Sequence, residues 1–246
     1  MFKIKKIKTM QFLAKNLSIF VLMFGLYACK KEPVNTPVSV YCNLINEKLY
    51  SFSRLSDFEK KKFDELKKSR FFKYKDHFIE AAQTFDIEWE LLAAVAFQES
   101  QWNPKARSAT QVKGMMMLTL PTAASVGVTN RLDPIQSIYG GAQYLSDLEA
   151  ITNFGTSSGD KIAFILASYN LGTTNVKNAI DAINKKTVEV TWLDLEEYLL
   201  NLKTSMDSEN YSRGQQTVDF VERVRDYYYL LLAQNHLEHY LNLLGT

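Results

Sequence analysis

The sequence predicts a mainly α-helical chain with one globular domain behind a removable leader. Apolar residues from Phe71 onward recur at three- and four-residue steps, as in Phe78, Ala82 and Phe85, which is the spacing of a helix face that packs into a core. No convincing strand alternation follows. The 246 residues are 46% hydrophobic and include only 10 Gly and 5 Pro, a composition that excludes disordered, collagen-like and linker-dominated chains.

The first 28 residues have the pattern of a secretory signal peptide. They contain five lysines and no acid, and the uncharged run from Leu17 to Ala28 is shorter than the roughly 20 residues of a membrane span. Without this segment, 24 basic residues stand against 27 acidic ones, a net charge near −3. That balance argues against nucleic acid as a partner. An uncleaved anchor helix remains the alternative.

The rest of the chain divides into three predicted parts. Residues 29–70 begin with a polar, proline-punctuated tether and include a charge-dense stretch over 57–68 that predicts an exposed helix. Residues 71–233 form the packed domain, and 234–246 form a C-terminal tail.

Helix start and stop signals divide the packed domain further. Asp133 before Pro134 predicts a helix through about Glu149. Asp160 is expected to cap the next helix and Gly172 to end it. A core-facing closing helix is expected over 217–232. The pair Gly140-Gly141 is costly inside a helix and therefore predicts close packing there.

Glu99 is the candidate catalytic acid. In the predicted helix over 89–100, helical spacing places it on one face with Leu92, Val95 and Ala96. A carboxyl group at the end of an apolar stripe loses hydration, which raises its pKa toward the range a general acid needs. A frayed helix end that exposes Glu99 to water is the alternative, and periodicity alone does not choose. No acid occurs between Ser100 and Leu132, so the nearby sequence lacks the second carboxyl group of an ordinary glycosidase. A fold that brings Asp133 or Asp147 close to Glu99 is the alternative.

Four blocks of sequence, in one order, resemble the lytic transglycosylase domain of the soluble lytic transglycosylase type. The blocks are Glu99-Ser100, Trp102-Asn103-Pro104-Lys105-Ala106 with Ser108, Gly114-Met115-Met116-Met117-Leu118 with Thr122-Ala123, and Ala167-Ser168-Tyr169-Asn170-Leu171-Gly172. The triple methionine and the run Tyr211-Ser212-Arg213-Gly214 are most similar to the membrane-bound F type of these enzymes. The resemblance covers roughly residues 71–229.

This resemblance implies a lysozyme-like fold that cleaves the β-1,4 bond between N-acetylmuramic acid and N-acetylglucosamine in peptidoglycan. One glutamate is both acid and base, the muramyl C6 hydroxyl is the nucleophile, and a 1,6-anhydromuramyl end is formed. The resemblance assigns the acid/base role to Glu99. It assigns substrate-binding roles to Ser108, Met115, Met116, Met117, Tyr169 and Asn170. Tyr169 is expected to donate to or orient the Glu99 carboxyl, while core packing is the plain alternative for each methionine.

The sequence departs from the family pattern at three of the positions near this site. Met117 replaces a common glutamine, Leu120 a common proline, and Phe220 a common tyrosine. These changes affect expected sugar contacts and leave Glu99 in place. A hydrolase of the same fold and a non-catalytic, wall-binding lipoprotein are the alternative functions.

The N-terminus also resembles that of bacterial lipoproteins. Leu26-Tyr27-Ala28-Cys29 is similar to a lipobox, in which the cysteine becomes the acylated first residue of the mature chain. The resemblance implies a lipid anchor on Cys29 and a position in the cell envelope, at the outer membrane facing the periplasm. Peptidoglycan strands and the membrane are the expected partners. No metal and no cofactor are expected, since two cysteines make no ribbon or cluster site and His236 and His239 with Glu238 do not form a metal motif.

Overall fold

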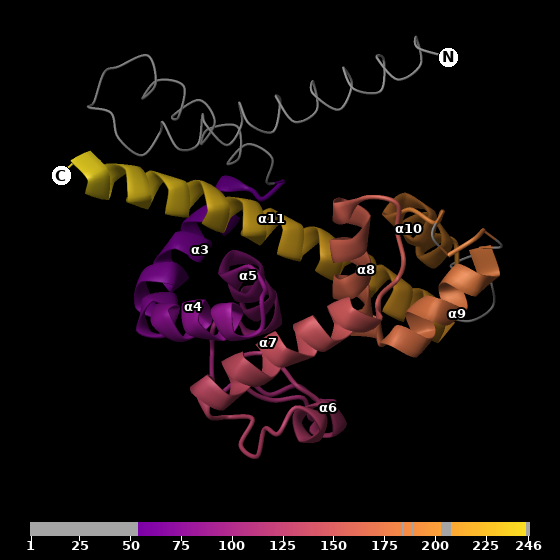
Figure 1. Cartoon of the computed structure of the whole chain (residues 1–246), viewed down its shortest axis with the longest axis horizontal. Coiled ribbons are helices and arrows are strands. Elements are labelled where there is room, and N and C mark those ends of the chain that lie inside the picture. Colours follow the sequence, from indigo (N-terminus) through magenta and orange to yellow (C-terminus); the bar gives the residue numbers. More distant parts are fainter. Residues whose placement is uncertain (1–53, 184, 188, 203–207, 245–246) are drawn as a thin grey trace, which may run out of the picture. The chain divides into compact units, whose positions relative to one another are not determined.

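The computed structural model describes residues 54–183, 185–187, 189–202 and 208–244. The expected signal peptide, Cys29 and the proline-punctuated tether lie outside these ranges. Within them the chain is helical, with two isolated bridges and no strand, so the prediction of a mainly helical fold is confirmed. The elements, in chain order, are α3 (Asp57–Ser69), η1 (Phe71–Lys73), α4 (Lys75–Thr84), α5 (Trp89–Ser100), α6 (Leu120–Ser125), α7 (Pro134–Ile151), α8 (Ser158–Leu171), α9 (Thr173–Ile183), α10 (Trp192–Asn201) and α11 (Ser208–Leu244) (Figure 1).

The chain forms two compact units. One consists of residues 53–228 and holds every candidate site residue described below. The other consists of residues 1–52 with 229–246, and the structure describes its residues 229–244 as the last part of α11. Among the described helices, none has a long enough apolar stretch to cross a membrane.

Helix α3 forms where the charge-dense stretch predicts a helix. Ser56 accepts from the main-chain N–H of Glu59, and the Glu59 side chain reaches back to the Ser56 N–H, a reciprocal cap that satisfies two free donors. The helix is not wholly exposed, however, because Phe63 is fully buried. The packed core therefore starts before residue 71.

An aromatic cluster forms the core around the second half of α5. Phe63 of α3, Phe97 of α5 and Tyr227 of α11 contact one another with ring centroids 4.4–5.5 Å apart. Trp102, also fully buried, lies 4.6 Å from Phe97 and 4.9 Å from Phe71. Tilted and edge-on aromatic pairs of this kind favour a fixed geometry, so the cluster holds the end of α5 in place.

Helices α7 and α8 pack against each other and begin at well-formed caps. Asp133 accepts from the Gln136 N–H at the start of α7, as predicted. At α8 the cap is Ser157, and Asp160 is the third helical residue that completes a capping box, so the predicted start was three residues late. Burial alone would raise the pKa of Asp160, but hydrogen bonds from Trp192 N–H, Ser157 and Thr156 outweigh it and lower the pKa to about 2.

The close packing predicted at Gly140-Gly141 is confirmed, although the partner is not another helix. A Cβ on Gly140 would lie 2.3 Å from Val128 Cγ2, and one on Gly141 would lie 2.6 Å from Met116 Cε. Both neighbours belong to the irregular region around α6. The two glycines therefore bring α7 against the methionine segment, which we define as residues 114–118.

The closing helix, α11, is longer than the predicted 217–232 at both ends. No glycine or proline interrupts residues 215–244, and Gly245 follows; the sequence thus continues the helix through the expected tail. Phe220, Val221 and Val224 are buried, as expected for a core-facing helix.

Candidate active site

Glu99 lies in the last turn of α5, the most buried helix near the site. Every residue from Leu92 to Phe97 is buried, so the helix is packed on all sides over this stretch and not on one stripe alone. Glu99 is the first acid after this run and keeps partial exposure. The helix therefore places one carboxyl group at the edge of the core.

The turn after Glu99 is held by specific contacts. Gln101 and Trp102 both have positive φ, 53° and 56°, a conformation that is unfavourable for residues other than glycine. Trp102 Nε1 donates to the Ala93 carbonyl (2.9 Å), and an Arg70 guanidinium nitrogen donates to the Gln101 carbonyl (3.0 Å). These bonds, with the burial of the Trp102 ring, fix the direction in which α5 ends.

Burial raises the pKa of Glu99 to about 8, because removing water disfavours the charged carboxylate. Burial is the single cause of this shift within the described ranges; no neighbouring carboxylate or cation there contributes to it. At pH 7 the carboxyl group is thus mainly protonated and carries a proton it can donate. The frayed, fully solvated helix end that the sequence left open is not what forms.

Tyr169, near the end of α8, is placed beside this carboxyl group. Burial and then the charge of Glu99 raise the pKa of the Tyr169 phenol, so the phenol lies within the electrostatic reach of the carboxyl group. The hydroxyl donates a 2.8 Å hydrogen bond to the Met116 carbonyl and not to Glu99, the acceptor that the sequence suggested. Tyr144 and Phe220 flank the Tyr169 ring, with centroids 5.2 and 6.2 Å away.

Side-chain hydrogen bonds tie the methionine segment to two helices. Ser100 Oγ lies 2.7 Å from the Met115 carbonyl, and Ser137 Oγ accepts from the Met116 N–H at 3.1 Å. Met115 and Met116 are fully buried and pack in the core, whereas Met117 is partly exposed and has a positive φ of 46°. Of the three methionines, Met117 has side-chain surface free to meet a substrate.

Ser108 and Asn170 are not seen in contact with this group. Ser108 Oγ pairs with Thr110 Oγ1 at 2.9 Å inside its own turn. Asn170 is exposed, and its amide oxygen lies 2.9 Å from the hydroxyl of Thr217 on α11. Asn170 thereby connects the end of α8 to α11. The next residue, Leu171, lines a cavity of about 220 Å³.

Three residues that organise the site were not predicted from the sequence: Ser100, Ser137 and Tyr144. Ser100 was visible as the neighbour of Glu99 in the motif, but its bond to Met115 spans 15 residues of irregular chain. Ser137 is a buried polar residue on the face of α7 that meets the methionine segment. No local signal separates Tyr144 from the other tyrosines of the chain.

The part of the chain that contains these residues is similar to known proteins. Residues 76–190 match the family model "Transglycosylase SLT domain", and this range contains Glu99 and the six expected substrate-binding residues. The chain is 41% identical over 190 residues to "Membrane-bound lytic murein transglycosylase F" of Shewanella loihica, covering 75% of this chain and 40% of that protein. It is also 41% identical over 164 residues to the protein of that name in Stutzerimonas stutzeri, covering 65% and 34%. The chain thus spans two fifths or less of these relatives.

Two solved structures are also similar to the chain. An inactive variant of lytic transglycosylase Slt from Pseudomonas aeruginosa has a TM-score of 0.49 at 18% identity, covering 68% of this chain and 24% of that one. The 70 kDa soluble lytic transglycosylase of Escherichia coli has a TM-score of 0.43 at 23% identity, covering 65% and 24%. The family assignment depends on the sequence matches, which include the site. Residues 76–190 of this chain are therefore a transglycosylase SLT domain.

Proposed function

We propose that the chain is a peptidoglycan lytic transglycosylase in which Glu99 is the single acid/base. The observation that carries the proposal is the state of Glu99: burial raises its pKa to about 8, and no second charge within the described ranges takes part. A glycosidase that activates water uses a second carboxyl group. A lone, protonated carboxyl group suits a reaction in which the substrate supplies its own nucleophile.

The reaction balances with one carboxyl group. Glu99 gives its proton to the glycosidic oxygen as the bond from that oxygen to muramyl C1 breaks, so the N-acetylglucosamine leaves with a free hydroxyl. The resulting carboxylate takes the proton of the muramyl C6 hydroxyl while that oxygen bonds to C1 and closes the 1,6-anhydro ring. Glu99 ends protonated, and no water is consumed. Intramolecular attack of this kind gains from the fixed proximity of the reacting atoms.

The surroundings suit both halves of the reaction. The buried helix α5 supplies the desolvation that keeps Glu99 protonated before cleavage. Tyr169 does not donate to the Glu99 carboxylate, since its hydroxyl proton is committed to the Met116 carbonyl. Met117 and Asn170, both with exposed surface, are the proposed contacts to the sugar, with Ser108 as a polar group near the scissile sugar.

We further propose that Cys29 is lipidated and anchors the enzyme in the cell envelope, at the outer membrane facing the periplasm. Residues 71–233, together with α3, whose Phe63 packs in the same core, form the proposed catalytic domain. The lipobox-like sequence supports the anchor. Both relatives described above are named as membrane-bound. Metabolic labelling with a fatty acid tests it: the full chain takes up label, Cys29→Ala does not, and label in that variant contradicts the assignment.

Replacement of Glu99 tests the function. Glu99→Gln keeps the shape of the side chain but has no transferable acid proton, so we expect release of muropeptides from purified wall to fall by a factor of roughly 10² to 10⁴. Sedimentation of the variant with insoluble wall should persist. Asp147→Asn, at an exposed acid of α7, is the matched control. Turnover in Glu99→Gln equal to that of this control would contradict the role of Glu99.

A further inference from the structure

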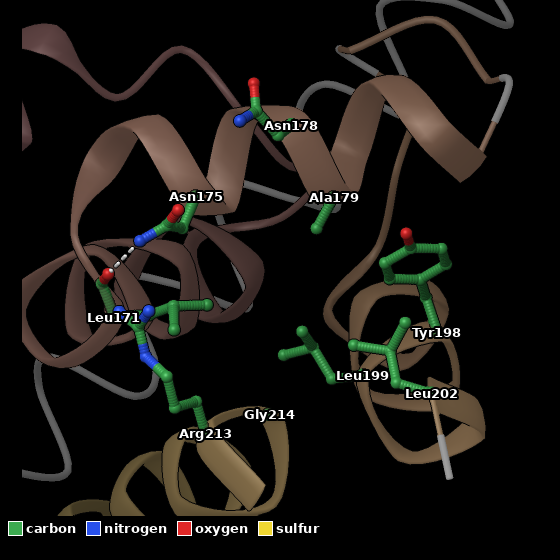
Figure 2. Close-up of a pocket in the computed structure, with 9 residues that line it drawn as sticks. All are labelled: Leu171, Asn175, Asn178, Ala179, Tyr198, Leu199, Leu202, Arg213 and Gly214. Carbon is green, nitrogen blue, oxygen red and sulfur yellow. Dashed lines mark hydrogen bonds between the residues drawn. The ribbon is translucent and has the colours of Figure 1, made fainter. Parts of the chain in front are cut away.

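A cavity next to the candidate site has features that the proposed cleavage reaction does not use. It measures about 220 Å³ and lies among the end of α8, α9, α10 and the part of α11 near Arg213 (Figure 2). The lining residues are Leu171, Asn175, Asn178, Ala179, Tyr198, Leu199, Leu202, Arg213 and Gly214. The cavity is smaller than a typical drug-sized site and suits one or two amino-acid residues.

The packing of α11 on α10 forms the floor of the cavity. A Cβ on Gly214 would lie 2.9 Å from the Leu199 carbonyl oxygen and 3.3 Å from Leu199 Cβ. Glycine thus permits the close approach of the two helices at this point. The approach directs the neighbouring residue, Arg213, to the rim of the cavity (Figure 2).

Arg213 is the one charged residue among those that line the cavity. Its side chain extends from α11 along the wall formed by Leu171 (Figure 2). This guanidinium makes no hydrogen bond or ion pair with the part of the chain that the structure describes. The main-chain carbonyl of Arg213, by contrast, accepts a hydrogen bond from Thr217. A guanidinium that is not committed to a carboxylate of its own chain is available to bind one from a ligand, in a two-pronged geometry.

The remaining lining residues complement Arg213. Asn175 donates to the Leu171 carbonyl at 2.8 Å, so that amide is committed, but Asn178 is exposed at the rim and has both donor and acceptor atoms. Leu199, Ala179 and the ring of Tyr198 give an apolar wall. A cation, an amide and an apolar wall together match a peptide that carries a carboxylate, whereas a neutral sugar uses no cation.

The position of the cavity connects it to the proposed site. Its lining includes Leu171, which directly follows Asn170 in the chain. The Thr217 hydroxyl lies 2.9 Å from the Asn170 side-chain oxygen and 2.9 Å from the Arg213 carbonyl oxygen. A substrate whose sugar contacts Asn170 therefore needs only a short branch to reach Arg213. In peptidoglycan, such branches are the peptides attached to the muramyl residues, and they carry free carboxylates.

We propose that this cavity, which we call the Arg213 cavity, binds a carboxylate of the peptide attached to the muramyl residue, through the Arg213 guanidinium. The proposal rests on the proposed function for its choice of substrate. It assigns to the domain a preference for strands that still carry their peptides, which the cleavage chemistry at Glu99 does not require.

Binding to a catalytically disabled protein tests the cavity separately from the reaction. In the full chain with Glu99→Gln, calorimetry compares N-acetylmuramyl tetrapeptide with the same compound after its peptide carboxylates are converted to carboxamides. We expect the carboxylate form to bind at least about 10-fold more tightly, because hydrogen bonds between charged groups are stronger than neutral ones. Equal binding of the two probes, or no binding of either, would overturn the proposal.

Variants locate the effect. Adding Arg213→Gln should bring the ratio of the two dissociation constants, carboxamide probe over carboxylate probe, close to one. Arg213→Lys should keep part of the preference for the carboxylate. Lys161→Gln, at an exposed cation of α8 outside the cavity lining, should keep all of it. Asn178→Trp should weaken the binding of both probes, because the larger side chain fills the rim of the cavity. A preference that survives Arg213→Gln, or undiminished binding to Asn178→Trp, would overturn the assignment. Because no turnover is measured, a failure of the proposed cleavage reaction leaves these outcomes interpretable.

Discussion

The Tyr169 hydroxyl donates a 2.8 Å hydrogen bond to the main-chain carbonyl of Met116, 53 residues earlier in the chain. This bond joins α8 to the methionine segment, while Ser100 joins the same segment to α5. Helix α5 carries Glu99. Hydrogen bonds from α5 and from α8 thus both hold the methionine segment.

Loss of this bond should destabilise the domain and reduce activity. Tyr169→Phe leaves the Met116 carbonyl without its donor, which we expect to lower the free energy of unfolding by about 1–3 kcal/mol. Activity should fall with it, since the methionine segment loses one of its supports. Urea unfolding and muropeptide release measure the two effects.

Tyr144→Phe is the matched control for this experiment. Tyr144 contacts the Tyr169 ring and is also partly buried, but no hydrogen bond of its hydroxyl is found in the described structure. Its loss should change stability little. Equal effects of Tyr169→Phe and Tyr144→Phe on unfolding would show that the bond to Met116 does not support the site.

The rate of cleavage should fall as the pH rises through about 8. A general acid must be protonated to act, and burial raises the pKa of Glu99 to about 8. An unperturbed glutamate, with its pKa of 4.5, would already be charged at pH 6. The profile of kcat/KM against pH on purified wall checks this, and a loss of activity centred near pH 4.5 would contradict the burial of Glu99.

Glu99→Gln should be more stable than the wild type at alkaline pH. Between pH 4.5 and about 8 the folded protein holds a proton that the unfolded chain has lost, so the wild-type free energy of unfolding falls as the pH rises through this range. Glutamine does not titrate. The stability difference should therefore grow across this range to on the order of 5 kcal/mol at most and stay constant above it.

Urea unfolding of both proteins at pH 4.5, 6.5 and 9 measures this difference. Asp147→Asn, at an exposed acid, is the control and should show no such growth. A Glu99→Gln advantage that is the same at all three pH values would mean that the carboxyl group is not desolvated.

Gly141→Ala should disturb the methionine segment. The added Cβ would lie 2.6 Å from Met116 Cγ and Cε, and forced overpacking costs typically about 1–3 kcal/mol of stability. Gly159→Ala is the control, because its Cβ would meet nothing closer than 3.8 Å in the first turn of α8. Thermal unfolding compares the stability of the two variants. A Gly141→Ala protein as stable as the control would show that the methionine segment moves to accept the added Cβ without loss of stability.

Local sequence signals predicted the helices well where the signal was a cap or a breaker. Asp133 with Pro134 placed the start of α7, and Gly172 placed the end of α8. The start of α8 was missed by three residues because Ser157 and Asp160 share the cap, and either residue alone is a plausible start. The length of α11 was underestimated because the expected tail contains no helix-breaking residue before Gly245.

The candidate site could be predicted only in part. The motifs identified Glu99 and Tyr169, and periodicity placed Glu99 at the end of an apolar run. The hydrogen bond from Tyr169 to Met116 and the support from Ser137 join residues 53 and 21 positions apart. Such contacts depend on how helices pack, which spacing within one helix does not encode. The Arg213 cavity is likewise formed by helices that meet only in the fold.

The most direct test of the account is the fate of water during cleavage. Purified peptidoglycan is digested with the full chain in water enriched in ¹⁸O, and the released muropeptides are analysed by mass spectrometry. We expect 1,6-anhydro products that are lighter than the hydrolytic products by one water and carry no ¹⁸O, with Glu99→Gln releasing almost none. Reducing ends that carry ¹⁸O, with no anhydro products, would show a hydrolase and contradict the mechanism proposed for Glu99.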